Sequence, residues 1–156
     1  MEKCFDIIEY TKAYEPRLTA FLEKCLPQSG RVLDINGRHS CYKNTEDYFK
    51  CFWCMLDNGN IIGVVAVKEL SSTDCELKSL YLLEHYHGRG FGKCLLNKAI
   101  AFAKEWGYEK MYLDSLSTST KAIALYRKTG FSDTERYNNN ERSDVFMVLD
   151  LSEYKG

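Results

Sequence analysis

Three glycines at alternate positions, Gly88, Gly90 and Gly92, separate a segment typical of a strand (76–83) from one typical of a helix (91–106). A strand, a glycine-rich turn and a helix N-terminus in this order can present several backbone N–H groups, reinforced by the helix dipole, to a phosphate. The spacing excludes two phosphate motifs, because a P-loop needs Gly-x4-Gly-Lys-Ser/Thr and the dinucleotide fingerprint needs Gly-x-Gly-x-x-Gly. The stretch therefore predicts a phosphate-binding turn of another kind.

The segments around this turn predict a mixed α/β domain. Asn58-Gly59 lies between two apolar runs and is a strong hairpin signal, because both positions tolerate positive φ. A strand, the helix at 91–106 and a further strand form a βαβ crossover, which requires at least one parallel strand pair. The sequence predicts strands at 4–10, 51–57, 61–70, 75–83, 110–114, 131–137 and 144–151, and helices at 14–26, 45–48, 91–106 and 121–128.

Local signals also predict where elements end and which way side chains point. Pro27 is expected to end the first helix, and Gly107 and Gly130 are expected to end two later ones. Period-two alternation along the strand at 75–83 would place one set of side chains on a common face: Glu76, Lys78, Leu80 and Leu82.

Length, charge and apolar runs restrict the class of protein. The 156 residues fit one domain spanning 1–156, and the formal net charge of −1 supplies no basic surface for nucleic acid or an anionic membrane. The longest apolar run, 61–67, is too short to span a membrane, and the N-terminus shows no secretory signal. We therefore expect a cytoplasmic protein with neither a nucleic acid nor a membrane as its partner.

The seven cysteines, an odd number, are expected to be reduced thiols. Cys51 and Cys54 form a CxxC pair, but residues three apart on a strand point to opposite faces. Buried core thiols are therefore favoured over a redox or zinc role. His85 and His87 have no third ligand at a suitable spacing, so no metal is expected.

Three segments of the chain match the motifs of one known protein family: 75–82, 86–92 and 122–131. Together they resemble the GNAT superfamily of acyl-CoA-dependent N-acetyltransferases. The family pattern at the turn is Gln/Arg-x-x-Gly-x-Gly/Ala, and here His87 stands at the first position, with Gly90 and Gly92 in place. The resemblance implies the GNAT fold, a central, twisted, mostly antiparallel sheet with helices on both faces. A parallel strand pair in that sheet would be splayed by a bulge into a V-shaped cleft for acetyl-CoA.

The resemblance implies acetyl-CoA as cosubstrate. Backbone amides at 88–93 would hold its pyrophosphate, and the strand edge at 80–82 would pair with its pantetheine arm. The Arg89 and Lys93 side chains would add charge to the phosphates or, alternatively, remain solvated. Ser119 occupies the place of an asparagine that usually binds the cofactor. The implied cofactor-binding residues are Leu80, Tyr81, Leu82, His87, Gly88, Arg89, Gly90, Phe91, Gly92, Lys93 and Ser119.

Two side chains match family residues that perform chemistry. An amine must lose a proton to attack a thioester, and a lysine-like amine has a pKa of about 10. Glu76 matches the general base that takes this proton, although a strand carboxylate paired with Lys78 is the alternative interpretation. Tyr126 matches a tyrosine that gives its proton to the CoA thiolate, and a backbone N–H near Leu82 would bind the oxyanion.

The resemblance therefore implies an N-acetyltransferase that moves an acetyl group from acetyl-CoA to a primary amine by direct attack in a ternary complex. The alternative is a non-catalytic acyl-CoA-binding module. The segments at 28–48 and 138–142 are polar and rich in tyrosine, which suits a hydrophilic small-molecule or peptide amine. No sequence feature identifies the acceptor, and a homodimer, common in the family, has no marked interface.

Overall fold

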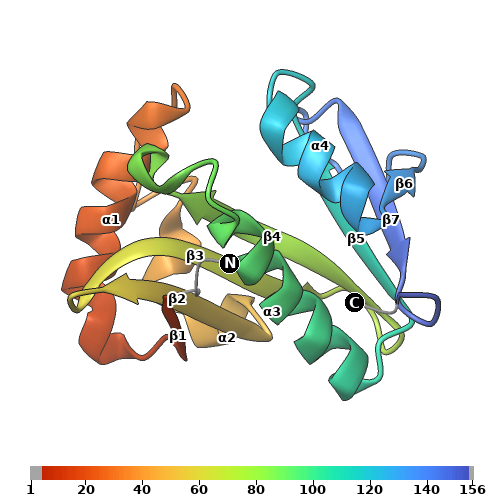
Figure 1. Cartoon of the computed structure of the whole chain (residues 1–156), viewed down its shortest axis with the longest axis horizontal. Helices are drawn as coiled ribbons and strands as arrows, with labels where there is room; N and C mark the ends of the chain where they lie inside the picture. The colour runs from red at the N-terminus through yellow and green to blue at the C-terminus, as the bar shows by residue number, and fades with distance from the viewer. Residues whose placement is uncertain (1–4, 155–156) are drawn as a thin grey trace. The chain divides into compact units, whose positions relative to one another are not determined.

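The computed structural model describes residues 5–154 (Figure 1). The chain divides into two compact units. The first unit contains the residues up to Lys68 together with Lys78–Ala99, and the second contains Glu69–Leu77 together with the residues from Ile100 onward. Strand β4 (Asp74–Leu82) and helix α3 (Phe91–Trp106) each contribute to both units.

Within residues 5–154, seven strands form a sheet of order β1-β2-β3-β4-β5-β7-β6. The strands besides β4 are β1 (Asp6–Glu9), β2 (Cys51–Asp57), β3 (Asn60–Glu69), β5 (Lys110–Ser115), β6 (Ser132–Asp133) and β7 (Val145–Asp150). β4 and β5 run parallel, whereas β1–β2, β2–β3, β5–β7 and β6–β7 are antiparallel. The expected mixed α/β class, with a mostly antiparallel sheet and a parallel pair, is confirmed.

The first unit contains the predicted hairpin between β2 and β3. Asn58 and Gly59 have φ of 51° and 79°, the two positive values that a type I′ turn requires. The helical elements of this unit besides α3 are η1 (Lys12–Tyr14), α1 (Glu15–Gln28), η2 (Ser40–Lys43), α2 (Thr45–Tyr48) and η3 (Glu84–Tyr86). Its core includes Leu18, Leu22 and Leu26 of α1 and Leu95 and Leu96 of α3, all nearly inaccessible to solvent. Burial of each leucine side chain contributes about 1.5–3 kcal/mol.

The expectation that Pro27 ends the first helix is wrong. Helix α1 continues through Pro27 to Gln28. A proline in the last turn removes only one intrahelical hydrogen bond, so the helix tolerates it there. The chain leaves the helix afterwards, and the N–H groups of Ser29 and Arg31 both bond to the Leu26 carbonyl, at 3.0 and 2.9 Å.

The second unit is built on β5 and β7, with helix α4 (Thr120–Thr129) beside them (Figure 1). Within this unit β4 pairs with β5 through Asp74↔Lys110, Cys75↔Met111 and Glu76↔Tyr112. A Cβ placed on Gly130, which follows α4, would lie 3.3 Å from Leu149 Cδ1 of β7. Gly130 has a φ of 122°, which accounts for glycine at the end of this helix.

The strand predicted at 131–137 is much shorter than expected. Pairing with β7 is limited to Ser132↔Val148 and Asp133↔Met147. The chain from 134 to 144 forms a loop, because its polar side chains bond to β4 and β5 instead of extending the ladder. Those contacts form part of the candidate site below.

The expected common face of β4 is also wrong. Alternation of side chains between faces requires an extended backbone at every residue. Ser79 has a φ of 55°, in the left-handed region, so the alternation from Glu76 cannot continue to Leu82. A left-handed residue inside a strand is a feature of bulges, which bend the strand locally.

The expectation of reduced cysteine thiols is met only in part. Cys25, Cys41, Cys51, Cys54 and Cys75 are free. Burial raises the pKa of the Cys51 thiol to about 11 and that of Cys54 to about 12, so neither is a reactive thiolate at neutral pH. Cys94 is disulfide-bonded, contrary to the expectation of reduced thiols. Sequence spacing does not show which cysteines approach to within the ~7 Å between Cα atoms that a disulfide needs.

Candidate functional site

The predicted glycine turn connects η3 to helix α3 in the first unit. Gly88 and Gly90 have φ of 77° and 85°, a region that residues with a side chain rarely adopt. A Cβ at either position would have no atom within 4 Å, so these glycines serve the backbone conformation rather than close packing. Gly92 lies in the first turn of α3, which starts at Phe91 as predicted.

The turn ends at the N-terminus of a 16-residue helix. The Cys94 N–H bonds to the Gly90 carbonyl at 3.2 Å, so the helical pattern begins there. Helix geometry leaves the N–H groups of Phe91, Gly92 and Lys93 without an intrahelical acceptor. Together with the dipole of a long helix, these donors form a site suited to an anion.

Side chains fasten the turn to the strands beside it. His87 Nε2 lies 2.8 Å from the Leu82 carbonyl oxygen, to which it donates in the tautomer protonated there. The Tyr86 hydroxyl donates to Asp57 Oδ2 at 2.7 Å. The Arg89 guanidinium carbon lies 4.9 Å from the centre of the Phe91 ring, although the arginine is exposed. His87, one of the residues predicted to contact the cofactor, is therefore bonded to the carbonyl group at the end of β4.

The predicted pantetheine strand, Leu80, Tyr81 and Leu82, is half-buried in the first unit. β3 approaches it closely at Gly63, where a Cβ would lie 3.0 Å from Leu82 Cδ1 and 3.2 Å from the Tyr81 carbonyl oxygen. A side chain at position 63 would thus displace the strand on which the predicted cofactor contacts lie.

The segment at 28–48, predicted to face the acceptor, is bonded to this part of β4 and to η3, which follows it. Gln28 Oε1 accepts from the Glu84 N–H at 2.8 Å, and Arg31 Nη1 lies 3.5 Å from the Tyr81 hydroxyl. The Tyr42 hydroxyl is 2.7 Å from Ser79 Oγ, at the left-handed residue of the strand. Burial raises the pKa of Tyr42 well above its usual value, so this hydroxyl stays protonated.

Glu76, the predicted base, lies on β4 in the second unit and is only 2% exposed. Its Oε2 accepts a hydrogen bond from the Tyr137 hydroxyl at 2.5 Å and one from Asn138 Nδ2 at 3.2 Å. Burial, followed by the charge and hydrogen bond of Glu76, raises the pKa of Tyr137 far above its usual range. Tyr137 therefore remains a donor to the carboxylate at every physiological pH.

A second carboxylate completes this cluster. Asp114 of β5 accepts hydrogen bonds from Asn138 Nδ2 at 2.6 Å, from Asn140 Nδ2 at 3.1 Å and from Ser143 Oγ at 2.7 Å. Tyr137 and Asp114 are not among the residues predicted for the site, and Asn138 was predicted only for the acceptor side. The run of three asparagines at 138–140 was the only signal, and it is equally typical of a surface turn.

Tyr126 and Ser119 also lie in the second unit. Tyr126 is on α4, is 7% exposed and packs edge to face against Phe131, with ring centres 5.8 Å apart. Ser119 precedes α4 at its N-cap position and is half-buried. Its side chain makes no capping hydrogen bond, so the serine is not needed to cap α4.

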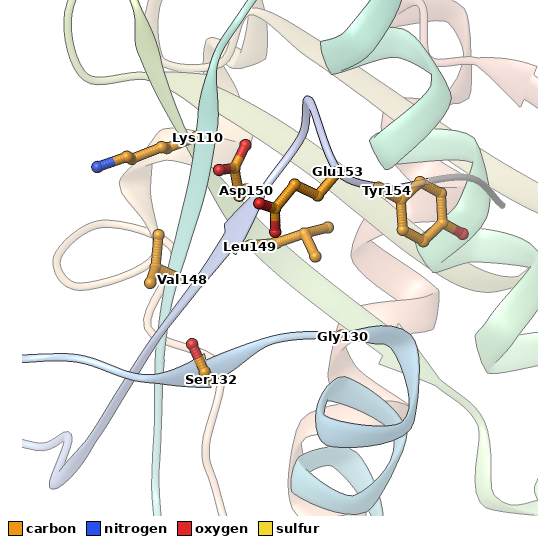
Figure 2. Close-up of a pocket in the computed structure, with 8 residues that line it drawn as sticks. All are labelled: Lys110, Gly130, Ser132, Val148, Leu149, Asp150, Glu153 and Tyr154. Carbon is orange, nitrogen blue, oxygen red and sulfur yellow. The ribbon is translucent and has the colours of Figure 1, made fainter.

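The second unit also contains a cavity of about 470 Å³ (Figure 2). It lies where the turn after α4 meets β5, β7 and the C-terminal residues, and its lining includes Lys110, Gly130, Asp150 and Glu153. None of the predicted site residues lines it. Its two carboxylates and single lysine give it no preference for a phosphate.

Residues 5–154 contain neither a metal-binding group of side chains nor a membrane-spanning helix. Within that range no group of three or more His, Cys, Asp or Glu side chains could coordinate a metal ion. Over the same residues, no helix combines the length and the apolar composition needed to cross a bilayer.

Residues 13–131 match the family model described as Acetyltransferase (GNAT) family. The chain belongs to this family. The matched range contains every predicted catalytic and cofactor-binding residue, whereas Tyr137 and Asn138 lie beyond its end.

Relatives and solved structures agree with this assignment. An uncharacterized N-acetyltransferase of Schizosaccharomyces pombe is 35% identical over 98 residues, which cover 62% of this chain and 60% of that protein. The aligned part of the chain thus spans about 60% of the length of this relative. An acetyltransferase of the GNAT family from Staphylococcus aureus has a similar fold, with a TM-score of 0.84, 23% identity and coverage of 94% and 98% of the two chains. A GNAT family acetyltransferase from Elizabethkingia anophelis, solved with acetyl-CoA bound, gives a TM-score of 0.71 at 19% identity and coverage of 96% and 99%.

Proposed function

We propose that this protein transfers an acetyl group from acetyl-CoA to a primary amine of a small molecule or peptide. The observation that carries the proposal is the glycine turn, in which left-handed Gly88 and Gly90 lead directly into the N-terminus of α3. This turn lies inside the region that matches the acetyltransferase family. An anion site of backbone donors is the chemistry that a CoA pyrophosphate requires.

The residues of the turn fit acetyl-CoA. The N–H groups at 88–93 would bind its pyrophosphate, with Arg89 and Lys93 exposed nearby to add positive charge. Leu80, Tyr81 and Leu82 would pair with its pantetheine arm, and Ser119 would donate one hydrogen bond. Bound acetyl-CoA supplies an acetyl group activated as a thioester.

Glu76 is proposed to take the proton from the attacking amine, directly or through a water molecule. Its carboxylate is buried and accepts two hydrogen bonds at Oε2, which keep it in one orientation. Positioned proton transfer of this kind typically contributes 10²–10⁴-fold to a rate. The reaction would be a direct attack in the ternary complex, without an acyl-enzyme.

Tyr126 is proposed to give its hydroxyl proton to the departing thiolate. A phenol hydroxyl is a hydrogen-bond donor and can give its proton to a sulfur anion. A backbone N–H near Leu82 is proposed to bind the developing oxyanion. The neighbouring Leu83 N–H donates to the Ile62 carbonyl at 2.9 Å and is therefore not the proposed donor.

The acceptor is proposed to be a hydrophilic amine. The segment at 28–48 lies along β4 in the first unit, and the 138–142 loop lies beside Glu76 in the second. Both present hydroxyl and amide groups, which suit a polar acceptor over an apolar one.

One observation favours a second candidate function, a non-catalytic acyl-CoA-binding module. Glu76 is 2% exposed and bonded to Tyr137 and Asn138, as a purely structural carboxylate would be. Such a module would bind acetyl-CoA and release no thiol with any amine.

The test is release of CoA thiol from acetyl-CoA over a panel of amines. We expect at least one hydrophilic amine to support turnover, and Glu76→Gln and Tyr126→Phe each to lower kcat by about 10²-fold. Glu69→Gln is a matched control, because Glu69 also accepts a tyrosine hydroxyl, that of Tyr108 at 2.5 Å. Binding of acetyl-CoA without thiol release would establish the module, and unchanged kcat in both variants would remove the assigned roles.

A further inference from the structure

Two consecutive side chains outside the family-matched region bond to Glu76. Tyr137 and Asn138 follow Glu76 by 61 and 62 residues and both donate to the same carboxylate oxygen, Oε2. A glutamate has three side-chain torsions, and two donors on one oxygen in a buried setting restrict all of them. The orientation of the proposed base is therefore set by a loop distant in sequence.

The Asn138 amide is itself held in one orientation. Its nitrogen donates to Glu76 Oε2 at 3.2 Å and to Asp114 Oδ2 at 2.6 Å, which uses both of its hydrogens. Its oxygen accepts from the Asn140 N–H at 3.1 Å. A flipped amide would place its oxygen against two carboxylates, so only one arrangement satisfies all three contacts.

Asp114 ties this amide to the sheet. It lies on β5, and its other oxygen accepts from Asn140 Nδ2 and Ser143 Oγ of the same loop. The Tyr137 ring packs on Tyr112 of β5, with centres 4.9 Å apart, and edge-on against Phe146 of β7, at 5.8 Å. The loop that contacts Glu76 is thus fixed to strands by polar and aromatic contacts.

We propose that Tyr137 and Asn138, with Asp114 behind them, are positioning residues for Glu76. They hold its carboxylate in the orientation in which it accepts the amine proton, and this role acts through Glu76 rather than through a contact with the amine. The inference rests on the proposed function, since it names the residues that orient the base of that reaction. A displacement of a catalytic group by about 1 Å can reduce a rate by about 10²-fold, which is the scale on which such residues act.

The experiment compares steady-state kinetics of the full-length wild type, Asn138→Ala and Tyr137→Phe in the thiol-release assay. We expect kcat to fall by about 10- to 100-fold in both variants, while the KM for acetyl-CoA changes by less than about twofold. Tyr108→Phe is the matched control, because it removes a hydroxyl–carboxylate bond of the same length, 2.5 Å, in the same unit. We expect it to lower stability to a similar extent as Tyr137→Phe and to leave kcat unchanged.

A double-mutant cycle with Glu76→Gln provides the decisive result. If Asn138 acts through Glu76, Asn138→Ala will cause little further loss of kcat in the Glu76→Gln background. An equal loss in both backgrounds, or a fall in kcat that Tyr108→Phe reproduces, would overturn the positioning role while leaving acetyl transfer intact. Absence of thiol release by the wild type would instead overturn the proposed function, and this inference with it.

Discussion

In the glycine turn before α3, the groups proposed to bind phosphate are backbone amides, and the residues that shape it, Gly88 and Gly90, have no side chains. Around Glu76 the interacting groups are side chains from β4, β5 and the loop at 134–144. The turn is made by neighbours in sequence, whereas the cluster joins residues more than 60 positions apart. We therefore expect substitutions in the turn to act by straining the backbone or by changing the charge. Substitutions in the cluster should act by leaving polar groups without hydrogen-bond partners.

The largest effect is expected from Gly90→Asp. It places a side chain at a φ of 85° and adds a negative charge where phosphates are proposed to bind. We expect acetyl-CoA affinity, measured by calorimetry, to fall by about 100-fold, or about 2.7 kcal/mol. Gly59→Asp is the control, because Gly59 also has a positive φ, 79°, with no atom within 4 Å of its Cβ position. Equal loss of affinity in both variants would refute the phosphate site.

Asp114→Ala tests the side-chain cluster. It leaves Asn138, Asn140 and Ser143 without the acceptor that they share. A buried donor that loses its acceptor costs about 1–3 kcal/mol. Asn138 and Asn140 are half-buried and keep bonds to Glu76 and Ser143, so we expect a total loss of about 2 kcal/mol. Urea unfolding measures it. Asp133→Ala, which removes an exposed ion pair with Arg127, should cost at most about 1 kcal/mol. A smaller loss for Asp114→Ala than for Asp133→Ala would show that the cluster contributes little.

Tyr42→Phe tests a position where a side chain is bonded to an irregular residue of the backbone. It therefore combines a feature of the glycine turn with one of the side-chain cluster. The variant removes the hydroxyl that bonds to Ser79, the left-handed residue of β4. We expect a loss of about 1 kcal/mol in the free energy of unfolding, since one buried hydrogen bond is removed. Tyr14→Phe, which keeps the ring beneath Arg17, should be nearly neutral. The same loss in both variants would mean that the bond to Ser79 adds nothing.

The smallest effect is a pH dependence from His39 in the same segment. Burial lowers the pKa of His39 below its usual 6.5, only partly offset by the charge of Asp34. Its Nδ1 accepts the Asp34 N–H at 2.9 Å, which requires that nitrogen to be unprotonated. The stabilisation is therefore complete above pH 6.5 and is lost as pH falls through the lowered pKa.

His39→Asn isolates this contribution, because an asparagine oxygen can accept the same bond without titrating. Urea unfolding between pH 8 and pH 5 should show that the wild type loses more stability than the variant in the acid part of the range. Parallel stability curves for the two proteins would rule out a role for His39.

Local signals predicted the elements whose ends depend on a few residues. Helix α3 runs from Phe91 to Trp106 as expected, with Gly107 at a φ of 104° after it. Other expectations failed. Pro27 lies inside α1, because a proline in the last turn removes only one intrahelical hydrogen bond. Non-local contacts decided two further cases: Ser79, bonded to Tyr42, interrupts the alternation of β4, and the strand after Phe131 gives way to a loop bonded to Asp114 and Glu76.

The sequence by itself indicated the family, through three motif segments taken together, and the conformation of the glycine turn, because glycine spacing records backbone conformations that only glycine adopts readily. It also indicated Glu76 and Tyr126 through their resemblance to family motifs. Only the tertiary structure revealed the partners of Glu76. Hydrogen bonds among Tyr137, Asn138 and Asp114 depend on strand register and loop path, which no local pattern of residues encodes.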